Sequence, residues 1–255
     1  MSLARVEQEG STLLIVNANP ARRGALSPDL YAAIGEAVSR AGDPAVRAVI
    51  FASEGGFFCS GGDLNTLKER TRLSLEERRA KVQELHDLVT RLRTCPVPVI
   101  AAVEGGAAGA GLSLALACDL LVAAPGSKFV ASYVKAGVVP DAGLTSALSR
   151  MLPRQLAMEM CLLARSISAE RMADLGVVNA VSDDPLDAAR KIAATLATGP
   201  RQAQGTIKRL VGQAYEASEH AQLEAEREAM IRAVVDTEAQ IGIAAFLDHK
   251  TPEFP

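Results

Sequence analysis

The stretch Ala101–Ala124, AAVEGGAAGAGLSLALACDLLVAA, carries the strongest fold signal in the chain. It begins as an apolar strand, turns through four glycines, continues as a very apolar helix and ends in a second apolar run. A glycine-rich turn at the start of a helix exposes backbone N–H groups at the positive end of the helix dipole. The stretch therefore predicts a strand–turn–helix–strand unit with backbone donors exposed at its turn.

Strand and helix patterns also alternate on both sides of this stretch. The expected strands cover Leu13–Asn17, Val46–Ser53, Pro96–Val103 and the run that follows Asp119. Between them lie helical patterns, such as the one capped by Ser27 and the one with Leu85, Leu88 and Leu92 on one stripe. Strands that alternate with helices predict an α/β core with parallel pairing. We read Asp119, between a buried helix and a strand, as a structural residue bonded to the backbone.

The last third of the chain is helical in pattern. Helices are expected over 186–196 and over roughly 201–247, and Ser168 should cap a helix that stops at Gly176. No Pro-, Gly- or Ser-rich linker separates this part from the α/β core. We therefore expect one large unit, with residues 196–255 as a helical extension of a core formed by residues 1–195.

Composition excludes several classes of protein. The chain has 255 residues, 49% of them hydrophobic, and a formal net charge of −3, which gives no general reason to bind nucleic acid or acidic membranes. Its apolar runs are too short to span a bilayer, and no signal peptide is evident. We expect a cytoplasmic protein with reduced thiols and no metal site, because widely spaced cysteines, without CxxC spacing, occupy positions Cys59, Cys95, Cys118 and Cys161.

Two glycine-rich turns follow strands, one at Gly55–Asp63 and one at Glu104–Gly111. A single turn of this kind usually serves only tight turning and close packing. The second turn has neither the lysine of a P-loop nor the glycine spacing of a dinucleotide-binding motif. Two such turns can direct two N–H donors at one oxygen. That arrangement is an oxyanion hole, suited to a carbonyl that becomes an enolate.

Four ordered motifs resemble the enoyl-CoA hydratase/isomerase (crotonase) superfamily over essentially the whole chain. They are FFCSGGDL, AAVEGGAAGAGLSLALACDLLVAA, SKFVASYVKAGVVPDAGLTSAL and AAFLDHKTPEF. The resemblance implies a crotonase-like spiral of ββα units followed by a helical C-terminal trimerisation region. It also implies a homotrimer or a dimer of trimers, and a role in fatty-acid or phenylacetate catabolism.

The resemblance further implies an acyl-CoA thioester substrate, with coenzyme A as part of the substrate and no permanently bound cofactor. The backbone N–H groups of Ser60 and Ala110 match the positions expected to hold the thioester oxygen. Lys208 is a weaker candidate for a CoA phosphate, and the alternative is an exposed helix lysine. The remaining CoA contacts that the resemblance implies are Gly61, Gly62, Asp63 and, across a subunit boundary, Phe246 and Lys250.

The chain departs from the hydratase pattern at both catalytic positions. Hydratases of this family use two glutamates where this sequence has Ser113 and Tyr133. Serine and tyrosine are poor general bases near neutral pH. The carboxylate left in this segment is Asp141, which either caps the following helix or takes part in catalysis. Isomerases of the family carry an acid at or near this place, so we expect an enoyl-CoA isomerase with Asp141 as acid/base.

Other interpretations remain open at this point. The protein could be a hydratase-type lyase. Alternatively, His86, Tyr133 and Asp141 resemble in position the functional residues of aryl-CoA dehalogenases, where the aspartate is a nucleophile. A third possibility is a catalytically weak acyl-CoA binder. In each case Tyr133, His86 and Ser113 are candidates to line the acyl pocket, although a helix histidine is more often a packing or surface residue.

Overall fold

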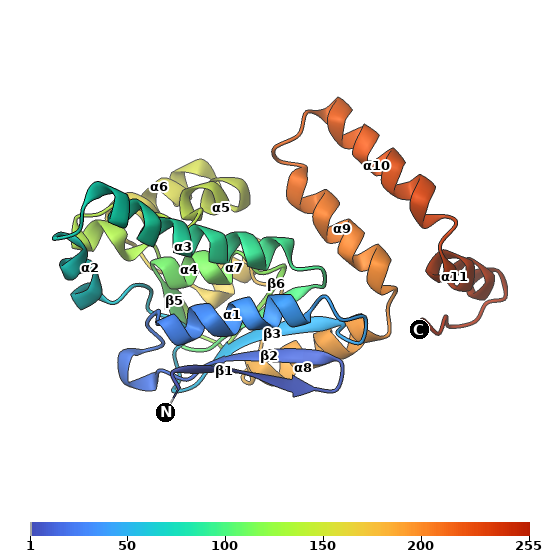
Figure 1. Cartoon of the computed structure of the whole chain (residues 1–255), viewed down its shortest axis with the longest axis horizontal. Helices are drawn as coiled ribbons and strands as arrows, with labels where there is room; N and C mark the ends of the chain where they lie inside the picture. Colours follow the sequence, from blue (N-terminus) through green and yellow to red (C-terminus); the bar gives the residue numbers. More distant parts are fainter. Residues whose placement is uncertain (1) are drawn as a thin grey trace.

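The computed structural model describes residues 2–255 and has the predicted α/β architecture (Figure 1). Its larger sheet pairs β1 with β2 antiparallel, and every other neighbouring pair of strands in it is parallel. These strands are, in spatial order, β1 (Ala4–Glu9), β2 (Thr12–Asn17), β3 (Ala48–Ser53), β4 (Val99–Val103), β6 (Leu120–Ala123) and β9 (Ala180–Val181).

A smaller sheet lies beside the first, and the two sheets together supply the strands of the repeating ββα units. Strand β5 (Gly106–Ala108) pairs parallel with β7 (Lys128–Val130), which pairs antiparallel with β8 (Ile167–Ser168). An isolated bridge joins Cys59 to Ala107. After β3 the chain therefore reaches the smaller sheet at Cys59 and then enters helices. After β4 it passes through β5 into helix α4 (Ala110–Ala115). This succession is the expected spiral of ββα units.

Alternate residues of the central strands face different layers. Leu13, Ile15 and Phe51 belong to the cluster packed by α1, α3 and α4, whereas Leu14 and Ile50 pack with residues of α8. Because both faces of the sheet are covered, the strands read as continuous apolar runs. The remaining helical elements of the core are η1 (Pro20–Arg22), α1 (Pro28–Arg40), α2 (Leu64–Arg70), α3 (Leu75–Thr94), η2 (Ser132–Ala136), α5 (Leu144–Met151), α6 (Arg154–Leu163), α7 (Ala169–Asp174) and α8 (Pro185–Ala197).

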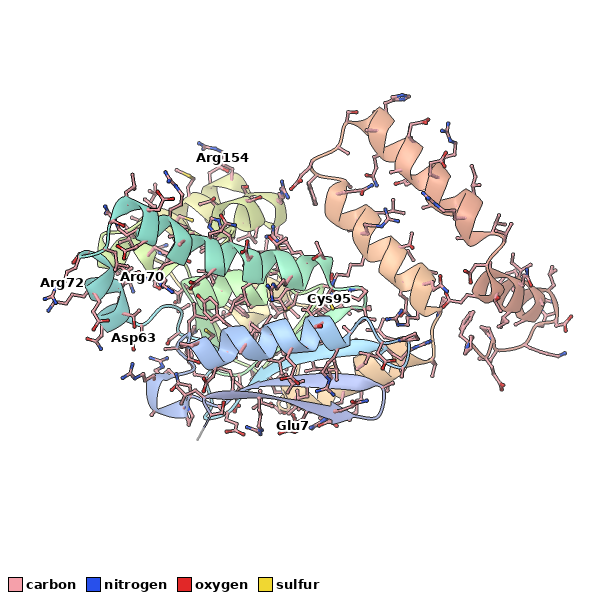
Figure 2. The ribbon with its side chains drawn as sticks, viewed as in Figure 1. Glu7, Asp63, Arg70, Arg72, Cys95 and Arg154 are labelled. Atoms are coloured by element: carbon pink, nitrogen blue, oxygen red, sulfur yellow. The ribbon has the colours of Figure 1, made fainter. Side chains whose placement is uncertain are left out.

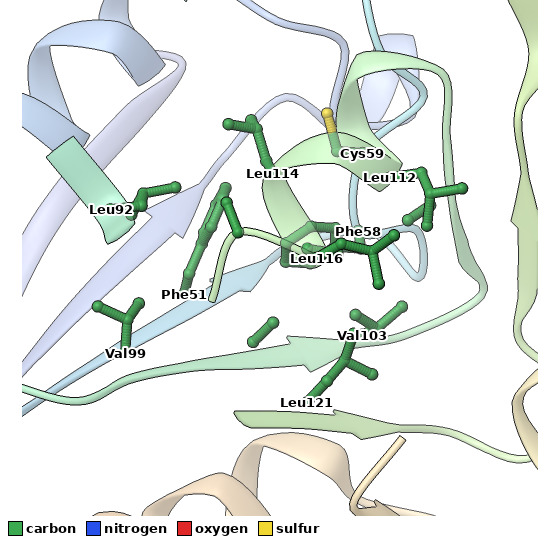
Figure 3. Close-up of a cluster of buried hydrophobic side chains, with 14 of the residues drawn as sticks. Phe51, Phe58, Cys59, Leu92, Val99, Val103, Leu112, Leu114, Leu116 and Leu121 are labelled. Atoms are coloured by element: carbon green, nitrogen blue, oxygen red, sulfur yellow. The ribbon is translucent and has the colours of Figure 1, made fainter. Parts of the chain in front are cut away.

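Local signals placed several of these helices correctly. The side chain of Ser27 accepts a hydrogen bond from the N–H of Leu30, and Ser168 caps α7 in the same way. The predicted stripe on α3 is buried against the core. Figure 3 shows α4 residues packed over Phe51 and Phe58, whose ring centroids lie 4.7 Å apart. The turn that opens α4 is therefore anchored to the sheet by its own helix.

The C-terminal helices extend away from the core (Figure 1). The predicted single helical stretch over 201–247 is wrong in detail, because it divides into α9 (Arg201–Gln213), α10 (Glu219–Ala233) and α11 (Thr237–Leu247). The side chains of Ser218 and Asp236 cap the last two helices and so mark the breaks. Trimerisation through this region stays a prediction. Within residues 2–255, no helix has both the length and the apolar character that crossing a membrane requires.

A buried lysine attaches the first of these helices to the core. Lys208 lies 2.6 Å from a carboxylate oxygen of Asp119 and donates to the carbonyl oxygens of Leu92 and Val97 at 3.0 and 3.2 Å. Its side chain is only 7% exposed. The expectation that Lys208 is a phosphate ligand or a surface lysine is therefore wrong. The structural interpretation of Asp119 is confirmed, because its carboxylate accepts from the N–H of Val99.

Replacing Lys208 by methionine should lower the free energy of unfolding by about 2 kcal/mol, because two buried carbonyl groups and Asp119 lose their donor. Asp119 retains 27% exposure of its side chain, which limits the cost. Urea denaturation measures the change. Lys191→Met is the matched control, since that lysine is exposed and pairs only with Asp187 on the surface. Equal stability of the two variants would contradict an anchoring role for Lys208.

Candidate active site

The two glycine-rich turns meet in direct backbone contact. A Cβ atom placed on Gly111 would lie 2.2 Å from the carbonyl oxygen of Cys59. On Gly61, which has a φ of +90°, it would lie 2.7 Å from the oxygen of Ala108 and 3.1 Å from the nitrogen of Ala110. Real Cβ atoms do not approach so closely, so only glycine allows this contact. The convergence of the two turns was expected from sequence, and their contact creates one shared site.

The free amides of this site differ from the predicted pair. The N–H of Ser60 donates to the carbonyl oxygen of Arg23 at 3.0 Å, and its hydroxyl donates to that of Arg22 at 3.1 Å. Ser60 is therefore bonded to the segment around η1, and its N–H is not available as the oxyanion donor of the first turn. Within residues 2–255, the N–H groups of Gly62 and Ala110 have no hydrogen-bond acceptor.

Gly62 and Ala110 thus offer one donor from each turn, each without an acceptor among the described residues. Ala110 is the first residue of α4, where an N–H has no partner inside the helix. Gly62 directly follows the glycine that contacts the nitrogen of Ala110. Sequence reasoning missed Gly62 as a donor because nothing in a run such as CSGGD shows which N–H is already bonded within the fold.

Asp141 does not cap the helix that follows it. Helix α5 begins after Gly143, and no side chain accepts a bond from its first turn. The carboxylate instead accepts a hydrogen bond from the hydroxyl of Tyr133, with Oη and Oδ1 2.6 Å apart. The backbone carbonyl of Asp141 accepts from the N–H of Leu144 at 3.1 Å and from the hydroxyl of Ser113 at 3.4 Å. The capping alternative for its side chain is therefore wrong.

An unusual turn holds this aspartate. Ala142 and Gly143 have φ values of +52° and +72° in succession. A non-glycine residue in the left-handed region costs roughly 1 kcal/mol or more and persists only where the surrounding structure enforces it. Ala142 is buried, and Leu144 is fully buried in the core beside it. The packing of these two side chains fixes the backbone of the turn, and with it the direction in which the side chain of Asp141 points.

The residues at the two glutamate positions of hydratases are neutral hydrogen-bonding groups here. Burial raises the pKa of Tyr133 well above its ordinary value, and the nearby carboxylate of Asp141 raises it further. The phenol therefore keeps its proton at all physiological pH values. Ser113 is buried on α4, one helical turn after Ala110. Asp141 is the acid that these two residues contact.

Two other predicted site residues, Asp63 and His86, have no described bond to Asp141. Asp63 caps α2, accepting from the N–H of Asn65 at 2.7 Å, and also pairs with Arg22. His86 is exposed on α3, and none of its described hydrogen bonds reaches Tyr133 or Asp141. Its acyl-pocket role stays a prediction, as do the CoA contacts of Gly61 and Asp63.

The C-terminal candidates are separate from the glycine turns within one chain. Phe246, at the end of α11, is 81% exposed, and Lys250 pairs with Asp248 at 3.0 Å. A cavity of about 730 Å³ lies among α9, α10 and α11, lined in part by Phe254 and not by the turn residues. No three His, Cys, Asp or Glu side chains in residues 2–255 cluster as metal ligands would.

Comparison with known proteins gives consistent matches. The profile of the family described as Enoyl-CoA hydratase/isomerase matches residues 7–255. A 1,2-epoxyphenylacetyl-CoA isomerase of Escherichia coli (strain K12) is 34% identical, over 99% of this chain and 97% of its own. A 2,3-dehydroadipyl-CoA hydratase of the same organism is 32% identical, over 100% and 99%. The crystal structure of an enoyl-CoA hydratase from Polaromonas sp. JS666 superposes with a TM-score of 0.95 at 41% identity, covering 99% of both chains.

Proposed function

The chain belongs to the enoyl-CoA hydratase/isomerase family, and from that premise we propose that it shifts a carbon–carbon double bond in an enoyl-CoA through a thioester enolate. One observation carries the proposal: Asp141 is the acid at a site whose two hydratase glutamate positions hold the neutral residues Ser113 and Tyr133. Hydration by paired carboxylates needs two acids. Moving one proton between two carbons needs only one.

The proposed reaction begins with a 3-enoyl-CoA whose thioester oxygen accepts hydrogen bonds from the N–H groups of Gly62 and Ala110. Asp141 removes a proton from the α-carbon, and the electrons move into the carbonyl to give an enolate conjugated with the double bond. The same carboxyl group then returns the proton to the γ-carbon. The product is the 2-enoyl-CoA, with no net gain or loss of atoms.

The two amides favour this chemistry because the charge develops at the oxygen they face. Donors that are fixed before the reaction stabilise an oxyanion without reorganising during it. Ala110 is also the first residue of α4, where the helix dipole is positive. The N–H of Ala108 in the second turn donates to the carbonyl oxygen of Cys59 in the first at 2.9 Å, and this bond holds the two turns together.

Hydration is the second candidate, favoured by the relative described as 2,3-dehydroadipyl-CoA hydratase. The 34% identical relative is instead described as an isomerase. For the present chain, hydration would require Asp141 alone to position water and move both protons. An aspartyl nucleophile, as in dehalogenases, would require a group to activate water at Asp141, and no described hydrogen bond joins Asp141 to the exposed His86.

Turnover in H₂¹⁸O distinguishes these reactions. With 3-enoyl-CoA we expect the 2-enoyl-CoA as product, with no ¹⁸O in the acyl group or in Asp141, measured by mass spectrometry of the product and of the digested protein. A 3-hydroxyacyl-CoA carrying ¹⁸O at C3 would identify a hydratase. Label in the carboxylate of Asp141 would identify a nucleophile, and either result would contradict the isomerase proposal.

A further inference from the structure

Asp141 is held from three separate elements. Tyr133 of η2 bonds its carboxylate, Ser113 of α4 bonds its carbonyl oxygen, and Leu144 at the start of α5 bonds the same carbonyl. The left-handed Ala142 follows it directly. Each contact comes from an element that also packs in the core, so the position of the carboxylate is set by the fold and not by solvent.

The two oxygens of this carboxylate differ in their partners. Oδ1 accepts the bond of Tyr133 at 2.6 Å, which is short for a hydroxyl donating to a carboxylate and typical of a charge-assisted bond. Among residues 2–255, no donor bonds to Oδ2. An oxygen that already accepts a strong hydrogen bond is a weaker base than its neighbour, because its lone-pair charge is stabilised.

We infer that Tyr133 is a positioning residue that blocks Oδ1 and leaves Oδ2 of Asp141 to take and return the transferred proton. The inference rests on the proposed function and adds to it how the proton travels. A proton held on a single oxygen, with its neighbour blocked, returns to the substrate faster than it exchanges with water. The isomerisation is then largely an intramolecular transfer on one face of the acyl group.

The bond of Tyr133 also stabilises the charged carboxylate, because the hydroxyl donates to one of its oxygens. The neighbouring phenol of Tyr31 on α1 is partly buried, which raises its pKa to about 12, so it is neutral as well. Arg70 faces the rest of the protein from α2, whereas Arg72 points outward (Figure 2). The charged or titratable groups that act on Tyr31 are Asp141, Arg70 of α2, Glu84 of α3 and the thiol of Cys59, and Arg93 of α3 lies beside Gly143 of the loop.

Tyr133→Phe tests the inference. We expect kcat to fall by roughly 10–100-fold, because the carboxylate loses the bond that orients it. With α-deuterated 3-enoyl-CoA in H₂O, the wild-type protein should carry deuterium into the γ-position, and the variant should lose most of it to solvent. A residue needed only for packing would lower stability without changing the deuterium transfer.

Tyr31→Phe is the matched control, because it removes the neighbouring phenol and leaves the bond from Tyr133 to Asp141 intact. Its deuterium transfer should equal that of the wild type. If Tyr133→Phe does not fold, 3-fluorotyrosine incorporated in the Tyr31→Phe background replaces it. The more acidic phenol is a stronger donor, so the share of deuterium carried to the γ-position should then rise.

Unchanged deuterium transfer in Tyr133→Phe, or no rise of that transfer in the fluorotyrosine protein, would overturn the inference. These results are separable from failure of the proposed function. If Asp141→Asn is inactive while Tyr133→Phe behaves as the wild type, only the role of Tyr133 is wrong. If Asp141→Asn retains wild-type activity, the proposed function is wrong, and the inference is overturned with it.

Discussion

Asp141→Asn is expected to lower kcat for conversion of 3-enoyl-CoA to 2-enoyl-CoA by about 10²–10⁴-fold. Asparagine has nearly the same shape, and its carbonyl oxygen can still accept the hydrogen bond of Tyr133, so the loop should keep its structure. The amide cannot hold and return a proton. Binding of substrate should therefore persist while the chemical step is lost, which steady-state kinetics and calorimetric titration with a product acyl-CoA would show together.

Glu84→Gln is the control for this variant. It makes the same carboxylate-to-amide change on α3, at an exposed side chain that pairs with Lys81 on the surface. Its activity should match that of the wild type. If Asp141→Asn retained activity within about threefold of the wild type, well short of the loss typical of a missing acid/base, Asp141 would have no part in proton transfer.

Ala110→Pro is the second prediction, with an expected loss of about 10²–10³-fold in kcat. Proline removes the N–H that faces the thioester oxygen and keeps the backbone dihedral that the first residue of a helix requires. Because Ala110 opens α4 and its N–H has no partner inside the helix, no helical hydrogen bond is lost. Circular dichroism should show an intact fold, and stopped-flow assays should show the lower rate.

Ala110→Gly is the matched variant, since it removes the methyl group and retains the N–H. We expect it to keep activity near that of the wild type. If the proline and glycine variants were equally active, the amide of Ala110 would not stabilise the enolate. If both were equally impaired, the side chain of Ala110, and not its backbone, would be the important feature of this position.

The amide expected from Ser60 shows what a motif can and cannot reveal. The first glycine turn was located correctly, and the two turns do meet at Gly61 and Gly111. The N–H of Ser60, however, bonds to Arg23, a residue far from it in the sequence. Which amide remains free therefore depends on a contact between distant segments. The local pattern of small residues does not predict that contact.

Lys208 and Tyr133 illustrate the same difficulty with side chains. A lysine on a polar helix reads as a surface residue, yet here the side chain of Lys208 reaches the core and pairs with Asp119. Tyr133 reads as a pocket residue, and the structure adds its bond to Asp141, eight positions along the chain. That bond forms because η2 and the left-handed turn at Ala142 bring the two side chains together.

The sequence by itself determined the α/β layers, the helix caps and the two glycine-rich turns, because these depend on the period of apolar residues and on backbone conformations that glycine alone adopts readily. The family resemblance added that Ser113 and Tyr133 occupy the two glutamate positions of hydratases, which leaves Asp141 as the acid of this segment. Only the tertiary structure decided that the amides of Gly62 and Ala110 are free and that Asp141 faces Tyr133 and not the helix after it. Hydrogen-bond partners are assigned by proximity in space, and that proximity arises only when the spiral packs its successive turns against one another.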